Sequence, residues 1–152
     1  MQWRKSTPSH DRVPEAPGLM VPAGPVPRFP GLRALVVEDE ALVALMIEDM
    51  LTDLGCEIAG SASTVAAALA LAEHVIVDVG LLDLNLGGEL SDPVATAFAR
   101  RGVPIIFATA YATCRLGDDW DRPVLQKPFT EYQLAHALAA ATAARWNELR
   151  AD

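Results

Sequence analysis

The chain has 152 residues, of which 51% are hydrophobic and 6% aromatic, and its formal net charge is −8. This length and composition indicate one domain with an aliphatic core; they exclude disorder throughout, and no apolar run reaches the roughly 18 residues of a membrane span. Residues 32–152 hold eight Lys and Arg against eighteen Asp and Glu, a charge of −10, which disfavours direct binding to a nucleic-acid phosphate backbone.

Residues 1–31 form a proline-rich segment, because seven of the eleven prolines fall in the first 30 positions. Proline fixes φ and lacks a backbone donor, so this density predicts a disordered arm rather than a helix or a paired strand. A linker, an upstream extension before Met20 and a docking segment are all open for it. The arm has no apolar stretch of signal-peptide length, so we expect a cytoplasmic protein in which Cys56 and Cys114 are free thiols.

From residue 32 onward, short apolar runs alternate with longer amphipathic segments. The predicted elements in chain order are a strand at 32–37, a helix at 41–54, a strand at 56–62, a helix at 64–74, a strand at 77–83, a loop at Gly87-Gly88, a helix at 93–101, strands at 104–109 and 123–127, and a helix from Thr130 to about 150. Residues 111–121 show no clear pattern. This alternation predicts one α/β domain over 32–150: a flavodoxin-like, doubly wound five-stranded parallel sheet with helices on both faces.

Two of the predicted helices carry patterns that bear on packing. In the first, apolar residues at helical spacing predict the face that covers the sheet: Val43, Met46, Ile47, Met50 and Leu54. Gly55 is predicted to end this helix. The last helix opens with a capping box from Thr130 to Gln133. It also carries alanines that suit either packing on the sheet or a homodimer interface: Ala135, Ala139, Ala140, Ala143 and Ala144.

Charged and polar residues stand where four of the predicted strands end: Glu38 and Asp39, Asp83, Thr109, and Lys127. The carboxyl ends of parallel strands share one edge of a sheet, so these side chains are expected to lie close together. Clustered carboxylates repel unless a cation neutralises them, and an oxygen-rich site of this kind suits Mg²⁺. Lys127 is the only lysine after residue 31 and adds a second positive charge. The set predicts a phosphoryl-transfer site in which Asp83 is the nucleophile and Thr109 hydrogen-bonds a phosphoryl oxygen.

Four motifs at these strand ends resemble a known family. "LVVEDE" (35–40), "LLDLNL" (81–86), "FATAY" (107–111) and "LQKPF" (125–129), in this order and spacing, are similar to the receiver domain of two-component response regulators. The resemblance implies that Mg²⁺ is held by Glu38, Asp39, Asp83 and the backbone carbonyl of Asn85. It also implies that Asp83 accepts a phosphoryl group from a histidine kinase, that Thr109 is the switch hydroxyl, that Lys127 pairs with the phosphate, and that Lys127-Pro128 is a cis peptide.

The motifs also resemble a subgroup of receivers known by the sequence FATGY, often served by kinases of the HWE or a related type. Ala110 stands here in place of the subgroup's glycine, which implies a stiffer loop after Thr109. Val124 stands where many receivers have an aromatic switch residue. We therefore expect the signal to leave by another route, through residues 111–121. Because the chain ends about where a receiver ends, the resemblance implies a single-domain receiver whose output is an unidentified protein partner, or a phosphate shuttle or sink.

Two other function classes are open at this point. A haloacid-dehalogenase-like phosphatase also combines a nucleophilic aspartate, Mg²⁺ and a lysine, but that resemblance would require an acid two residues after the nucleophile, where this chain has Asn85. A phosphate-independent pseudo-receiver would keep the fold alone, and the intact acids and Lys127 count against it. Taken singly, Asp39 and Asp83 also fit structural roles, because acids favour helix N-termini and turns.

Overall fold

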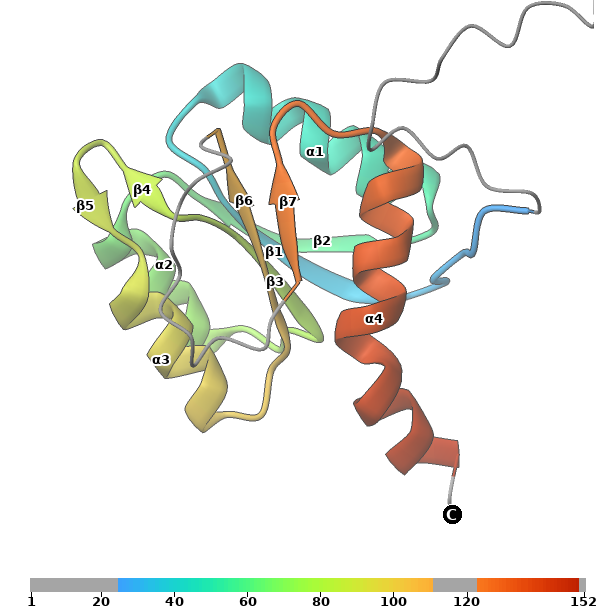
Figure 1. The fold of residues 1–152 in the computed structure, drawn as a ribbon. Helices are drawn as coiled ribbons and strands as arrows, with labels where there is room; N and C mark the ends of the chain where they lie inside the picture. Colours follow the sequence, from blue (N-terminus) through green and yellow to red (C-terminus); the bar gives the residue numbers. More distant parts are fainter. Residues whose placement is uncertain (1–24, 111–122, 151–152) are drawn as a thin grey trace, which may run out of the picture.

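The computed structural model describes residues 25–110 and 123–150, and within these residues a parallel sheet of five strands forms the centre of the fold (Figure 1). Its strands are β1 (Arg33–Val37), β2 (Glu57–Ala62), β3 (Val79–Asp83), β6 (Ile105–Thr109) and β7 (Val124–Gln126). They lie in the order β2-β1-β3-β6-β7, and every neighbouring pair is parallel. This is the flavodoxin-like order, so the predicted fold class is confirmed.

Helices cover both faces of this sheet (Figure 1). They are α1 (Ala41–Asp53), α2 (Val65–His74), α3 (Asp92–Arg100) and α4 (Glu131–Arg150). Helices α1 and α4 pack on one face and α2 and α3 on the other, and each face buries its own aliphatic cluster. A sheet covered on both sides needs apolar residues at every position, which explains the uninterrupted apolar runs in the sequence. Among the described residues, no helix is both long and apolar enough to cross a membrane.

Local contacts explain several features of the sequence. The capping box is confirmed: the Gln133 N–H donates to Thr130 Oγ1 at 3.1 Å, and the Thr130 N–H donates to Gln133 Oε1 at 2.9 Å. Gly80 lies in β3 where α3 comes close, because a Cβ added there would stand 3.1 Å from Leu82 Cδ1 and 3.5 Å from the Phe98 ring. A Cβ at position 80 would therefore require the Leu82 side chain to shift, whereas it would meet the Phe98 ring of α3 at an ordinary packing distance.

The face of α1 that packs on the sheet contains four of the five predicted residues, because Ile47 and Leu54 are buried and Val43 and Met50 pack against the same cluster. The buried residues are Ala44, Ile47 and Leu51, whereas Met46 is 57% exposed. The prediction of Met46 as a core residue was wrong. Helix α1 carries apolar residues on more than one stripe, and the exposed stripe consists of Leu42, Leu45 and Met46. The spacing therefore identified most of the face that packs on the sheet but misplaced Met46.

The alanines of α4 do not share one environment. Ala135 is buried against the sheet, whereas Ala140 and Ala143 are exposed. The sequence left two roles open for these alanines, packing on the sheet and a homodimer interface. Ala135 packs on the sheet. The side chain of Ala144 lies outside the described part of the chain.

Residues just upstream of β1 contact the folded domain. The Phe29 N–H donates to Leu54 O at 2.7 Å, and the Gly31 N–H donates to Gly55 O at 3.0 Å. The Phe29 ring packs on the core beneath α1 and α4. These contacts begin before residue 32, so part of the segment that we assigned to the arm is bound to the end of α1. The remainder of that arm, residues 1–24, and the predicted signal route at 111–121 lie outside the described residues.

A short hairpin follows β3 where the sequence predicted only a loop. Strands β4 (Asn85–Leu86) and β5 (Glu89–Leu90) pair antiparallel, and Gly87-Gly88 connect them. The two glycines have φ values of 61° and 95°, the positive pair that a type I′ hairpin turn requires. The hairpin projects from the sheet edge that carries the candidate site (Figure 1).

Candidate functional site

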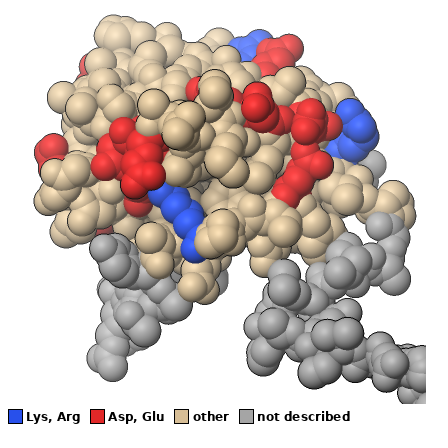
Figure 2. Space-filling model, turned by 90° about the horizontal axis from the view of Figure 1, so that it is seen from above, with Lys and Arg blue, Asp and Glu red and all other residues tan. Residues whose placement is uncertain are grey.

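Five of the predicted site residues lie at the carboxyl edge of the sheet. Glu38 and Asp39 directly follow β1, Asp83 is the last residue of β3, Thr109 is the last residue of β6, and Lys127 directly follows β7. Figure 2 views this edge from above and shows acidic side chains gathered there, with one basic side chain against them. The parallel order of the strands is what brings together residues separated by up to 89 positions.

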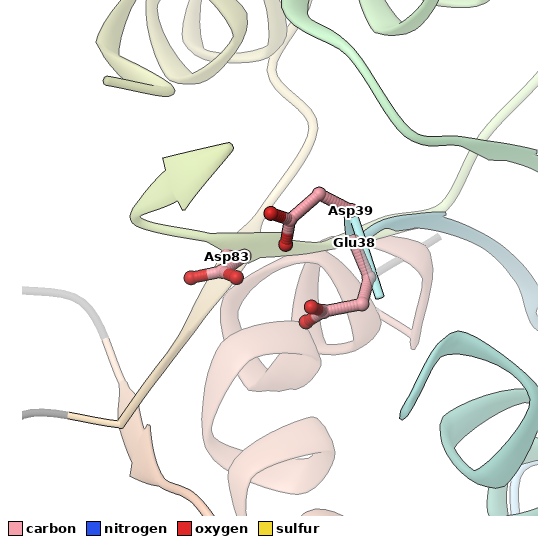
Figure 3. Close-up of side chains that lie close together, drawn as sticks. All are labelled: Glu38, Asp39 and Asp83. Atoms are coloured by element: carbon pink, nitrogen blue, oxygen red, sulfur yellow. The ribbon is translucent and has the colours of Figure 1, made fainter. Parts of the chain in front are cut away.

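Three carboxylates converge at this edge. Glu38, Asp39 and Asp83 each place a carboxylate oxygen within 4.8 Å of the other two, and Figure 3 shows the three side chains facing a common point. Glu38 is 2% exposed, Asp83 is half-buried and Asp39 is exposed. A set of hard oxygen donors open to solvent on one side is a donor set that fits Mg²⁺, which binds through a few carboxylates and keeps several waters.

Lys127 supplies a positive charge inside this cluster. Its ammonium forms an ion pair with Glu38, and its Nζ lies 3.1 Å from Asp83 Oδ2. The Lys127 side chain is only 16% exposed. One lysine therefore bridges the carboxylates that follow β1 and β3, which explains why the single lysine of the domain stands at the end of β7.

Burial and charge perturb the titration of this pair. Desolvation raises the pKa of Glu38, and the charge of Asp83 acts in the same direction against the hydrogen bond from Lys127. Desolvation acts to lower the pKa of Lys127, but the hydrogen bond to Glu38 and the charge of Asp83 outweigh it, and the pKa of Lys127 is raised. The ammonium is therefore fully charged at neutral pH, whereas the negative charge on Glu38 is held at an energetic cost.

Thr109 and Asn85 adjoin the cluster through their backbones. Thr109 is buried, and its carbonyl oxygen accepts the Lys127 N–H at 2.7 Å. In the pairing of β3 with β6, Asp83 lies opposite Ala108, so Thr109 extends one residue beyond that pair. The Asn85 N–H donates to Asp83 Oδ1 at 3.2 Å, which places Asn85 next to the candidate nucleophile. The peptide bond between Lys127 and Pro128 is cis, as predicted.

One contact in the site was not predicted from the sequence. The Gly87 N–H, at the tip of the β4–β5 hairpin, donates to Asp39 Oδ2 at 3.1 Å. The Asn85 side chain closes the same turn, because its Oδ1 accepts the Gly88 N–H at 2.7 Å. A glycine pair between two short segments is a hairpin signal that could have indicated this turn. The donor, however, is a backbone group, which no side-chain motif reveals.

Comparison with known proteins identifies the family. The model of the response regulator receiver domain matches residues 34–139, which is most of the chain. The chain belongs to this family. The receiver resemblance drawn from the four motifs is thereby confirmed, and the receiver is a module of two-component signalling rather than an enzyme that turns over a small substrate.

Several regulators are similar to this receiver. The transcriptional regulatory protein PdtaR of Mycobacterium tuberculosis is 32% identical over 124 residues, which cover 78% of this chain and 60% of PdtaR. The solution structure of SdrG from Sphingomonas melonis Fr1 is 47% identical with a TM-score of 0.67, covering 73% of this chain and 96% of SdrG. The crystal structure of the response regulator PhyR from Brucella abortus is 29% identical with a TM-score of 0.73, covering 82% of this chain and 53% of PhyR.

These matches differ in how much of each relative they include. The alignment spans about 60% of the length of PdtaR and about half of PhyR, but nearly all of the SdrG chain. A BeF3-activated conformation of SdrG has also been solved, at 49% identity and a TM-score of 0.63, covering 71% of this chain and 93% of that one.

Proposed function

We propose that this receiver accepts a phosphoryl group on Asp83 from a histidine kinase, of the HWE or a related type, in a Mg²⁺-dependent reaction in the cytoplasm. One observation carries this proposal: Lys127 Nζ lies 3.1 Å from Asp83 Oδ2, inside a cluster of three carboxylates at the open edge of the sheet. A nucleophile, a fixed cation and a divalent-cation donor set are the parts that phosphoryl transfer needs.

The charges of the site explain why a metal would be required. Glu38, Asp39 and Asp83 together carry −3 when ionised, and Lys127 returns +1, which leaves −2 before any phosphate arrives. A phosphoryl donor is itself anionic, so the bare site would repel it. A Mg²⁺ held by the three carboxylates and the backbone carbonyl of Asn85 would neutralise that charge and the charge that develops on the transferred group.

In the proposed step, a carboxylate oxygen of Asp83 attacks the phosphorus of a phosphohistidine on the kinase. A P–O bond forms and the P–N bond breaks, with the electron pair returning to the imidazole nitrogen. Lys127 stabilises the phosphoryl oxygens by its charge, and Thr109 contributes a hydroxyl to one of them. The product is an aspartyl phosphate, which hydrolysis by water removes.

The consequence of phosphorylation would be altered contact with another protein. Receivers signal through their surfaces, and this one has an exposed apolar stripe on α1 made of Leu42, Leu45 and Met46. Stripes of this kind are typical of surfaces that bind other proteins. Contact with a protein partner is therefore part of the proposed function.

Phosphorylation by a small donor tests the proposal directly. Wild-type protein incubated with acetyl phosphate and Mg²⁺ should gain the mass of one phosphoryl group, and Asp83→Asn should not. Asp49→Asn is the matched control, because it removes one exposed carboxylate from α1 away from the cluster. A chelator should abolish the adduct of the wild type and of Asp49→Asn.

Two other outcomes would redirect the proposal. If neither a small donor nor a histidine kinase yields an adduct, the protein is a pseudo-receiver. If the wild type hydrolyses phosphomonoesters over many turnovers, it is a phosphatase. Titration with BeF₃⁻ and Mg²⁺ gives an independent readout, since an activated SdrG conformation was obtained with this ligand.

A further inference from the structure

The β4–β5 hairpin connects the two acids that stand on different strands of the site. At its base, the Asn85 N–H donates to Asp83 Oδ1 at 3.2 Å, and at its tip, the Gly87 N–H donates to Asp39 Oδ2 at 3.1 Å. The candidate phosphoacceptor and a candidate metal ligand are therefore joined by the three residues 85–87. Figure 3 shows the carboxylates of Asp39 and Asp83 pointing toward one another.

The Asn85 side chain holds the turn in the shape that makes this connection. Its Oδ1 accepts the Gly88 N–H at 2.7 Å, the shorter of the two turn contacts. The two strands of the hairpin are only two residues long each, so their ladder adds little rigidity. Both turn residues are glycines with positive φ, and glycine restricts its backbone conformation less than other residues because it has no Cβ. Leu86 anchors β4 in the core, and at the base the Ser91 N–H donates to Leu84 O at 3.1 Å, so the Asn85 acceptor acts on the Gly87-Gly88 turn at the tip.

We propose that Asn85 is a positioning residue for Mg²⁺: its side chain fixes the hairpin turn, and the turn directs the Gly87 N–H onto Asp39 so that this carboxylate is oriented as a metal ligand. This role is distinct from that of the Asn85 backbone carbonyl, which any residue supplies. The inference rests on the proposed function, because it presupposes that the three carboxylates bind the metal.

The physical basis is the ordering of an exposed carboxylate. Asp39 is exposed, so its side chain would otherwise sample several rotamers and lose that freedom when it binds a metal. The Gly87 N–H fixes one oxygen through a charge-assisted hydrogen bond and leaves the second oxygen available. Loss of a group that orients a metal ligand typically weakens metal affinity tenfold or more. Asn85 acts through the turn, so we expect an effect of about tenfold, at the lower end of that range.

Linkage requires the effect to be reciprocal. If the closed hairpin strengthens Mg²⁺ binding, Mg²⁺ must stabilise the closed hairpin by the same factor. The exchange of the Gly87 amide with water reports the closed state, because its hydrogen bond to Asp39 must break before exchange. Mg²⁺ should therefore slow this exchange. The expected factor is the ratio of the Mg²⁺ affinities of the closed and the open turn.

The experiment compares Asn85→Ala with the wild type and with Leu90→Ala. Leu90 lies on the same hairpin, is 60% exposed and is also neutral, so it controls for any loss of side-chain bulk. Calorimetric titration with Mg²⁺ should give an affinity about tenfold weaker for Asn85→Ala and unchanged for Leu90→Ala. By NMR, the Gly87 amide should exchange faster in Asn85→Ala without metal. Asn85→Asp, which keeps an acceptor oxygen for Gly88, should restore slow exchange.

The outcomes separate this inference from the proposed function. If the wild type does not bind Mg²⁺, the proposed metal-dependent function fails together with the inference. If the wild type binds Mg²⁺ and Asn85→Ala binds it equally well, only the positioning role is overturned. The role is also overturned if Mg²⁺ speeds Gly87 exchange, since the metal and the hairpin would then compete for Asp39, or if Asn85→Asp exchanges as fast as Asn85→Ala.

Discussion

Replacing Asp39 by asparagine should stabilise the metal-free protein while removing its response to Mg²⁺. The substitution keeps the shape of the side chain and an oxygen that can accept the Gly87 N–H. It removes one negative charge from a cluster whose carboxylate oxygens lie within 4.8 Å of one another. Asp39 makes no ion pair with Lys127 among the described contacts, so little attraction is lost with the charge.

The size of the effect follows from the spacing. Two unit charges 4.8 Å apart repel by about 0.9 kcal/mol at the dielectric constant of water, and by more where solvent is partly excluded. Asp39 takes part in two such pairs, with Glu38 and with Asp83, so neutralising it relieves about 1.7 kcal/mol. A negative charge near the N-terminus of α1 is itself stabilising, so its removal destabilises the fold by roughly 0.3–1 kcal/mol. The net gain is about 1 kcal/mol, which raises the Tm of a domain of this size by about 4 °C.

Thermal unfolding followed by circular dichroism measures this gain. In EDTA at pH 8 and low ionic strength, Asp39→Asn should unfold at a higher temperature than the wild type. Saturating Mg²⁺ should reverse the order, because only the wild type gains binding energy from the metal. Asp49→Asn, which also removes an exposed acid from this part of the chain, should match the wild type in both buffers.

Two results would refute the reasoning. If Asp39→Asn unfolds at or below the wild-type temperature in EDTA, the three carboxylates do not repel as their spacing requires. If its advantage persists in 1 M salt, the gain is not electrostatic, since the screening length there falls to about 3 Å.

Three further predictions concern Lys127, the α1 core and Cys56. Lys127→Ala should retain Mg²⁺ binding in calorimetric titrations, because the carboxylates remain, but react slowly with acetyl phosphate; loss of metal binding would contradict this. Leu51→Ala should lower the free energy of unfolding by about 2–5 kcal/mol in urea titrations and Met46→Ala by under about 0.5 kcal/mol, because only Leu51 is buried. Burial raises the pKa of Cys56 to about 11, so in a Cys114→Ser background its thiol should react with a disulfide reagent at pH 8 far more slowly when folded than in guanidinium.

The edge of the sheet was predictable from sequence because strand ends are marked by composition. A parallel strand buried on both faces must be apolar, so the first charged residue after each run shows where the strand meets solvent. Glu38, Asp83 and Lys127 were placed at one edge by that rule together with the strand order. The joint appearance of these residue types then restricted the chemistry more than any single motif could.

The features that sequence analysis missed depend on tertiary contacts or on backbone groups. Met46 and Ile47 are both apolar at helical spacing, and packing against the sheet selected Ile47. Phe29 lies in a proline-rich segment, yet its ring packs on the core and its N–H donates to the end of α1. The hairpin donates from Gly87, whose N–H is common to almost every residue type. Periodicity and motif spacing do not encode contacts of these kinds.

The position of Lys127 indicates how phosphorylation would be transmitted without an aromatic switch. Its ammonium is divided between Glu38 and Asp83, and its N–H is bonded to Thr109 O. A phosphoryl group would add negative charge at Asp83 and none at Glu38. The Lys127 ammonium should therefore shift from Glu38 towards Asp83. The shift would act on the ends of β6 and β7, because the Lys127 backbone is tied to Thr109. Val124 is 44% exposed and has no ring to turn inward. BeF₃⁻ should therefore perturb the NMR signals of Thr109 and Lys127 more than those of Val124. A larger perturbation at Val124 would contradict this route.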